Sequence, residues 1–203
     1  HLPYRPSQSE CALQASDIEH LYLNEAENRL VFVDGHYSPE LSKIVDQAAL
    51  VIGNLPEFLS THSATLECHL GQYATFENNV FSALNTAFLR DAALILVPKN
   101  VSVTRPIHLL FIATQQEVTS YPRCLLIGET GSNVTIIEDY VALQDATYIT
   151  NSVTEISLAA NAHARHIRVQ RENTQAFHFA NCAVSLAHAS HYQSASISLG
   201  SHI

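Results

Sequence analysis

Histidine is the residue type most used to bind metals and to move protons near neutral pH, and this chain has twelve. Two pairs, His163 with His166 and His188 with His191, are three residues apart in segments that favour β-strand. Residues three apart in a strand point to opposite faces, so neither pair can chelate one ion. The spacing therefore indicates structural histidines.

His178 and Cys182 are four residues apart and share a strand face. At ~3.3 Å per residue they are separated by about 13 Å, too far for one metal with bonds of roughly 2.0 to 2.3 Å. No metal site is expected within a single strand.

The four cysteines are Cys11, Cys68, Cys124 and Cys182, spaced about 57 residues apart with no C-x-x-C pair. This spacing favours reduced thiols over a disulfide framework or a zinc finger. Cys68 adjoins His69, which points their side chains apart. We expect Cys124 and Cys182, in apolar strand contexts, to behave as small hydrophobic residues.

Other catalytic patterns are weak. The segment 128–132 is glycine-rich but lacks the lysine of a phosphate-binding loop, and no G-x-S-x-G motif is present. Glu138 and Asp139 alternate faces in a strand. Asn100 and Asn133 begin glycosylation sequons that chance explains. We therefore assign no catalytic, cofactor-binding or metal-binding residue.

Charge and hydropathy limit the partners. The formal net charge of -9 disfavours nucleic acid, and the longest apolar run, residues 92–97, is far shorter than the ~20 residues that span a bilayer. With no signal-peptide pattern, we expect a cytoplasmic protein that does not contact a membrane. The absence of methionine and an unfinished pattern after residue 198 suggest a fragment of a longer protein.

Two regions must position these residues. In region 1–91, a β-branched run stopped by Asp34-Gly35 predicts a hairpin, and apolar spacing of three and four predicts two helices between residues 54 and 91, the second from about 77 to 90. Region 92–203 consists of short strand-like runs, which are residues 92–97, 107–113, 124–127 and 134–137.

The second region repeats itself. Residues 126–137 align with 156–167 at an offset of 30, and residues 158–163 align with 186–191 at an offset of 28. Strands and small-residue corners with a period near 30 are typical of a β-solenoid, in which each coil covers the previous one. The offset places His163 and His191 on neighbouring strands, where their imidazoles could stack.

Residues 173–203 contain no Asp, Glu, Lys or Arg. Because an exposed sheet edge is normally protected by charge, we expect this stretch to pack against further coils or a partner subunit. An unpaired end would make the isolated piece form a homodimer or aggregate.

Four segments, residues 29–37, 85–88, 104–110 and 159–167, occur in the order in which they occur in the SufD scaffold proteins of the SufB/SufD family. From about residue 22 onward the chain resembles that family. The cysteine-rich motif near the start of SufB proteins is absent, which favours the SufD branch.

The resemblance implies a mainly β fold, a right-handed parallel β-helix preceded by a small N-terminal α/β region. It implies a non-catalytic scaffold for iron-sulfur cluster assembly with two partners, a SufB-type subunit and the ATPase SufC. A cluster would rest only transiently on the full complex. The family's interface cysteine and histidine and its SufC-binding segment lie downstream of this chain, so no residue role is carried over.

Two alternatives remain open on this architecture. β-Solenoids also host carbohydrate-active enzymes, which need charged side chains on an exposed groove, and the uncharged stretch after residue 173 argues against that. A purely structural homo-oligomer would not bind a SufC-type ATPase.

Overall fold

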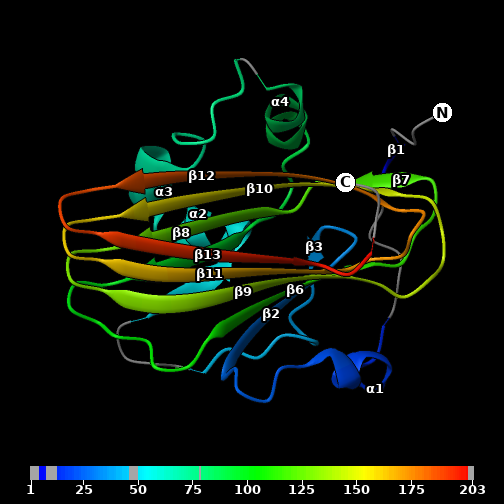
Figure 1. Cartoon of the computed structure of the whole chain (residues 1–203), viewed down its shortest axis with the longest axis horizontal. Helices are drawn as coiled ribbons and strands as arrows, with labels where there is room; N and C mark the ends of the chain where they lie inside the picture. The colour runs from blue at the N-terminus through cyan, green and yellow to red at the C-terminus, as the bar shows by residue number, and fades with distance from the viewer. Residues whose placement is uncertain (1–4, 8–12, 46–49, 78, 201–203) are drawn as a thin grey trace.

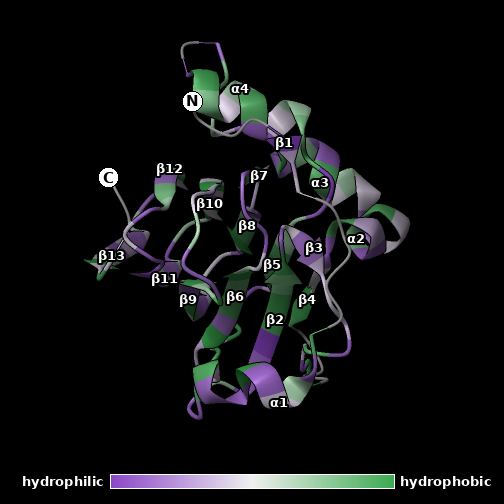
Figure 2. Cartoon of the chain, turned by 90° about the vertical axis from the view of Figure 1, so that its right-hand side faces the viewer, coloured by the Kyte–Doolittle hydropathy of each residue, from purple (hydrophilic) through white to green (hydrophobic). Residues whose placement is uncertain are grey.

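The computed structural model describes residues 5–7, 13–45, 50–77 and 79–200. From residue 93 onward the chain runs back and forth between two facing sheets (Figures 1 and 2) and forms a β-solenoid. The two sheets, named here sheet A and sheet B, enclose the main core.

Each sheet is mostly parallel. Sheet A contains β1 (Arg5–Pro6), β4 (Val51–Asn54), β5 (Ala93–Val97), β7 (Val118–Ser120), β8 (Arg123–Gly128), β10 (Ile149–Leu158) and β12 (Phe177–Leu186). Sheet B contains β2 (Asn28–Val33), β3 (His36–Tyr37), β6 (Ile107–Ala113), β9 (Asn133–Ala142), β11 (His163–Arg171) and β13 (His191–Ser198).

The strand register confirms the repeat. In sheet A, Leu126 pairs with Ile156 and Leu158 pairs with Leu186, at the expected offsets of 30 and 28 residues. In sheet B, His163 pairs with His191. The run-based strands after residue 91 are also confirmed, although β9 extends further than expected.

One corner of the solenoid is built the same way in successive coils. Asn100, Gly131, Asn161 and Ala189 all have positive φ, between 54° and 68°. The backbone N–H of each of the first three donates to a carbonyl of the following corner, at 2.9 to 3.1 Å. Glycine and asparagine accept this backbone conformation at low cost, which explains the small-residue corners of the sequence repeat.

The N-terminal region contributes strands to both sheets. The predicted hairpin is confirmed: β2 and β3 are antiparallel, and Asp34 and Gly35 have φ of 49° and 84°, as a type I′ turn requires. β2 also pairs with β6 in parallel, and β4 pairs with β5 antiparallel. This region therefore begins the sheets that the coils continue.

The helices differ from the prediction. Besides α1 (Ala15–Ile18) and a 3₁₀ turn, η1 (Glu19–Leu21), there are α2 (Leu55–Thr61), α3 (Ser63–His69) and α4 (Val80–Ala87). The prediction missed α3 and began α4 too early. α4 starts at Val80 because the Asn79 side chain accepts the N–H groups of Phe81 and Ser82 and caps it.

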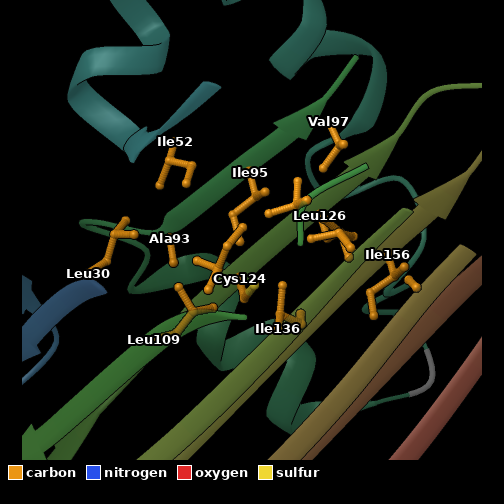
Figure 3. Packing of buried hydrophobic residues seen from close by; sticks show 14 of the residues in the cluster. Leu30, Ile52, Ala93, Ile95, Val97, Leu109, Cys124, Leu126, Ile136 and Ile156 are labelled. Carbon is orange, nitrogen blue, oxygen red and sulfur yellow. The ribbon is translucent and has the colours of Figure 1, made fainter. Parts of the chain in front are cut away.

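The main core lies between the sheets. Its first coils are filled by aliphatic side chains such as Leu30, Ile95 and Leu109, which Figure 3 shows pointing into the same space. Two smaller clusters seal the outer faces. One lies under α2 and α3 on sheet A, and the other joins Ile18 to sheet B.

Candidate functional site

The solenoid interior changes from apolar to polar along its axis. Leu109 of β6 faces inward, and the residue paired with it on the next coil is Glu138 of β9. Ile136 is likewise followed by His166 of β11. The sequence reasoning treated these as ordinary strand residues and missed that they meet in the interior.

Glu138 is the centre of this polar interior. Its side chain is 1% exposed and accepts hydrogen bonds from Thr154 Oγ1 at 2.6 Å and Tyr140 Oη at 3.1 Å. The His166 Nε2 atom lies 3.4 Å from Glu138 Oε2, an ion-pair contact without the alignment of a hydrogen bond. Burial opposes ionisation, but His166 and the two hydroxyl donors outweigh it and lower the pKa of Glu138 to about 2.

His166 links the buried carboxylate to the last described coil. Its Nδ1 atom lies 2.9 Å from the Tyr192 hydroxyl of β13, which in turn lies 3.6 Å from Cys182 Sγ of β12. Burial alone would lower the pKa of His166, but the Glu138 carboxylate and, after it, Cys182 raise it to about 10. His166 is therefore an imidazolium at neutral pH, and both of its ring nitrogens carry a proton.

Cys182 and Cys124 lie on the same inner face, two rungs apart. Cys124 is 1% exposed, as expected, whereas Cys182 is exposed because the described residues include no strand beyond β12 that would cover it. Burial raises the pKa of Cys124 well above its usual value. The two thiols therefore have opposite environments.

A second polar network lies nearby. His178 Nδ1 is 2.6 Å from Glu172 Oε2, and its Nε2 is 3.1 Å from Ser152 Oγ, with Thr150 Oγ1 donating to the other carboxylate oxygen at 2.7 Å. This order of groups matches a serine-histidine-carboxylate relay. However, Ser152 and His178 are 3% and 6% exposed, and the small cavity beside the network is lined by Thr150 and Glu172 but by neither of them. The network is therefore closed to an acyl substrate.

Asp139 occupies the outer face of sheet B, as the alternation with Glu138 predicted. It is bound by Arg171 Nε at 3.1 Å and Arg171 Nη2 at 2.5 Å, and His108 Nε2 lies 3.4 Å away. Burial opposes ionisation, yet these partners lower the pKa of Asp139. Glu138 and Asp139 therefore belong to two separate polar networks, one inside the solenoid and one on the outer face of sheet B.

The outer face also carries the stacked histidines. His163 and His191 are exposed, with ring centroids 4.8 Å apart, which confirms the expected stack, while His166 points inward. Among the described residues no group of three or more His, Cys, Asp or Glu side chains could hold a metal ion.

A cavity of about 390 Å³ lies between α3 and the corner after β8. Cys68 and His69 both line it, together with Gly128 and Glu129 of the corner. His69 Nδ1 lies 2.6 Å from the Tyr73 hydroxyl, and burial lowers the pKa of His69. The glycine-rich segment is thus a solenoid corner, as predicted.

A buried ion pair attaches the helices to sheet A. Glu155, 0% exposed, accepts Arg123 Nη2 at 2.6 Å and the backbone N–H groups of Gly71, Tyr73 and Ala74 at 2.9 to 3.0 Å. These bonds fix the segment after α3 against two successive coils. The ion pair therefore joins the segment after α3 to sheet A and is not part of the polar interior.

α4 is held by its polar face. Asn85, fully buried, donates from Nδ2 to the carbonyls of Pro122 and Asn151, at 2.9 and 2.8 Å. Its Oδ1 accepts Arg123 Nη1 at 3.1 Å. By contrast, Val80, the first residue of α4, is 65% exposed.

Comparison with protein families matches both regions. Residues 14–109 match the model described as the SufBD protein N-terminal region, and residues 111–203 match the model described as SUF system FeS cluster assembly, SufBD core domain. The chain is thus a two-sheet β-solenoid protein with a SufBD-type N-terminal region. It belongs to the SufBD family.

Individual relatives agree. An iron-sulfur cluster assembly SufBD family protein of Synechocystis is 36% identical over 95% of this chain and 45% of its own length. The iron-sulfur cluster assembly protein SufD of Escherichia coli is 29% identical over 78% of this chain and 36% of its own length. The chain thus spans less than half the length of these relatives. No helix in the described part of the chain is long and apolar enough to cross a membrane.

Proposed function

We propose that the chain is the N-terminal part of a SufD-type scaffold subunit for iron-sulfur cluster assembly. The observation that carries the proposal is the match of two SufBD family models, in order, to residues 14–109 and 111–203, on a chain that folds as a β-solenoid. The E. coli relative that is named SufD supports the branch.

As a scaffold, the protein acts in the cytoplasm with a SufB-type subunit and the ATPase SufC, and it turns over no substrate of its own. Iron and sulfide are the cargo, and a cluster rests transiently on the full complex. A long, rigid stack of coils suits this role, because it presents extended surfaces to partner subunits.

The test is coexpression of the full-length protein with its SufB-type and SufC-type partners, using an affinity tag on the ATPase. We expect all three chains to copurify through size exclusion in a fixed ratio. A second arm asks whether the full-length protein restores iron-sulfur enzyme activity in cells that lack their own SufD.

Two results would reject the proposal. One is a folded protein, verified by circular dichroism, that neither copurifies with the ATPase nor restores activity. The other is cleavage of a polyuronide by the purified protein, which would indicate a carbohydrate-active enzyme. Sedimentation of the protein alone separates a structural homo-oligomer, which would assemble without either partner.

A further inference from the structure

Two histidines lie side by side on the outer face of sheet B. His163 of β11 pairs with His191 of β13 in the parallel register, and their rings stack with centroids 4.8 Å apart and planes 22° apart. Both side chains are exposed. Among the described residues this stack is the one side-chain contact of either ring, so the fold leaves their nitrogens open to a ligand from solvent.

This exposure does not depend on how far the solenoid continues. His163 has a strand on each side, β9 and β13, and is still exposed, because its side chain points away from the interior. A further coil stacked after β13 would lie beside His191 in the sheet and not over the outer face.

We propose that His163 and His191 form a surface site for a divalent transition metal ion that prefers imidazole ligands, such as Ni²⁺, Cu²⁺ or Zn²⁺, with water completing the coordination. The site joins two successive coils. The inference goes beyond the scaffold role proposed above and does not rest on it.

The spacing of the strands suits two ligands of one ion. Imidazole nitrogens bind such ions at about 2.0 to 2.1 Å, so two nitrogens on one ion lie about 3 to 4 Å apart. Neighbouring strands are separated by ~4.8 Å, and the two ring centroids have the same separation. A small rotation of the two exposed rings about their side-chain bonds therefore brings one nitrogen of each within range of a shared ion.

The charges around the pair make both imidazoles necessary. Arg165 lies two residues along β11 on the same face and is exposed, so its cation opposes a metal ion there. The formal net charge of -9 favours cations at the surface as a whole. Tight binding requires the two imidazoles to act together, because once the ion has one of them the second is an intramolecular ligand.

The outer face supplies a rescue position on the other side of His163. Asn133 of β9 pairs with His163 in the same register and is also exposed. The substitution Asn133→His therefore places a new imidazole one strand from His163, but two strands, about 9.6 Å, from His191. It can replace His191 as the second ligand and cannot replace His163.

The experiment uses the full-length protein without an affinity tag, with Ni²⁺ as the probe. The imidazole NMR signals of histidine-labelled protein, assigned from the variants, are followed as Ni²⁺ is added, because this paramagnetic ion broadens the rings that it binds. We expect the His163 and His191 signals to broaden together, at a Ni²⁺ concentration about tenfold lower or more than the signal of His20, an exposed histidine of η1.

Four variants test the cause, each at an exposed position and verified as folded by circular dichroism. His163→Gln and His191→Gln should each raise the Ni²⁺ concentration needed by the remaining ring to that of His20, whereas His20→Gln should leave the pair unchanged. Asn133→His should restore tight binding to His191→Gln but not to His163→Gln. Broadening of the pair no earlier than that of His20, tight binding that survives His191→Gln, or no rescue by Asn133→His would each overturn the proposal.

Discussion

Replacing Glu155 by glutamine should strongly destabilise the protein. The carboxylate is 0% exposed and accepts four hydrogen bonds, three from backbone N–H groups and one from Arg123, which is itself 1% exposed. Glutamine keeps one acceptor oxygen, but its NH₂ group must face a donor, and Arg123 becomes an uncompensated buried cation. Removing one partner of such a pair costs about 3 to 5 kcal/mol.

Urea unfolding followed by circular dichroism measures this loss, provided that the slope of the transition is unchanged. Glu67→Gln is the matched control, because Glu67 is an exposed carboxylate on α3 and should change the free energy of unfolding by less than about 0.5 kcal/mol. If Glu155→Gln lowered the free energy of unfolding by less than about 1 kcal/mol, the Arg123–Glu155 ion pair would not be what attaches the helices to the coils.

Three further predictions concern the interior, α4 and the corners. The Glu138–His166 pair should stabilise the fold most between pH 4.5 and 6.5. Its contribution is lost as the pH falls through the lowered pKa of Glu138, about 2. It is also lost as the pH rises through the raised pKa of His166, about 10. Glu138→Gln should remove the contribution of this pair to both limbs of a plot of unfolding free energy against pH, while the acid limb due to Asp139 and Glu172, whose pKa values are also lowered, remains. Asn85→Ala should cost about 1 to 3 kcal/mol in urea unfolding, because two buried carbonyls lose their donor; Ser63→Ala, at an exposed helix position, is its control. Gly131→Ala should lower the free energy of unfolding by about 1 to 2 kcal/mol and so lower the melting temperature. The φ of Gly131 is 68°, and a new Cβ would lie 2.5 Å from Asn100 Oδ1. An unchanged melting temperature would mean that the corner adjusts to the new side chain without cost.

The repeat could be predicted from the sequence because it depends on local residue types. Short apolar runs alternate with corners that need positive φ, and residues such as Gly131 and Asn161 satisfy that need directly. Once one corner is aligned with the next, the register of every intervening strand follows. The offsets of 30 and 28 residues were correct for this reason.

The helices and the interior could not be predicted in the same way. Apolar spacing located α4, but the buried residues of this helix are Ser82 and Asn85, and the tertiary hydrogen bonds of Asn85 do not show in the apolar pattern. The contact between Glu138 and His166 depends on which strands face each other across the interior. A usable signal existed: given the offset of 30, His166 aligns with Ile136 of the core, which marks it as inward-facing.

The polar interior is not what stability alone would favour. At the rung before Glu138 the same inward position holds Leu109, and at the rung before His166 it holds Ile136, so this fold accepts aliphatic side chains there. Buried ion pairs are often no more stabilising than well-packed apolar residues of similar volume, because both charges must lose their hydration. The charged pair supplies directional contacts that an aliphatic pair lacks: Glu138 of sheet B accepts a hydrogen bond from Thr154 of sheet A, and His166 contacts the Tyr192 hydroxyl of the next strand. The change from apolar to polar along the axis therefore replaces non-directional packing by contacts that join sheet A to sheet B at defined positions.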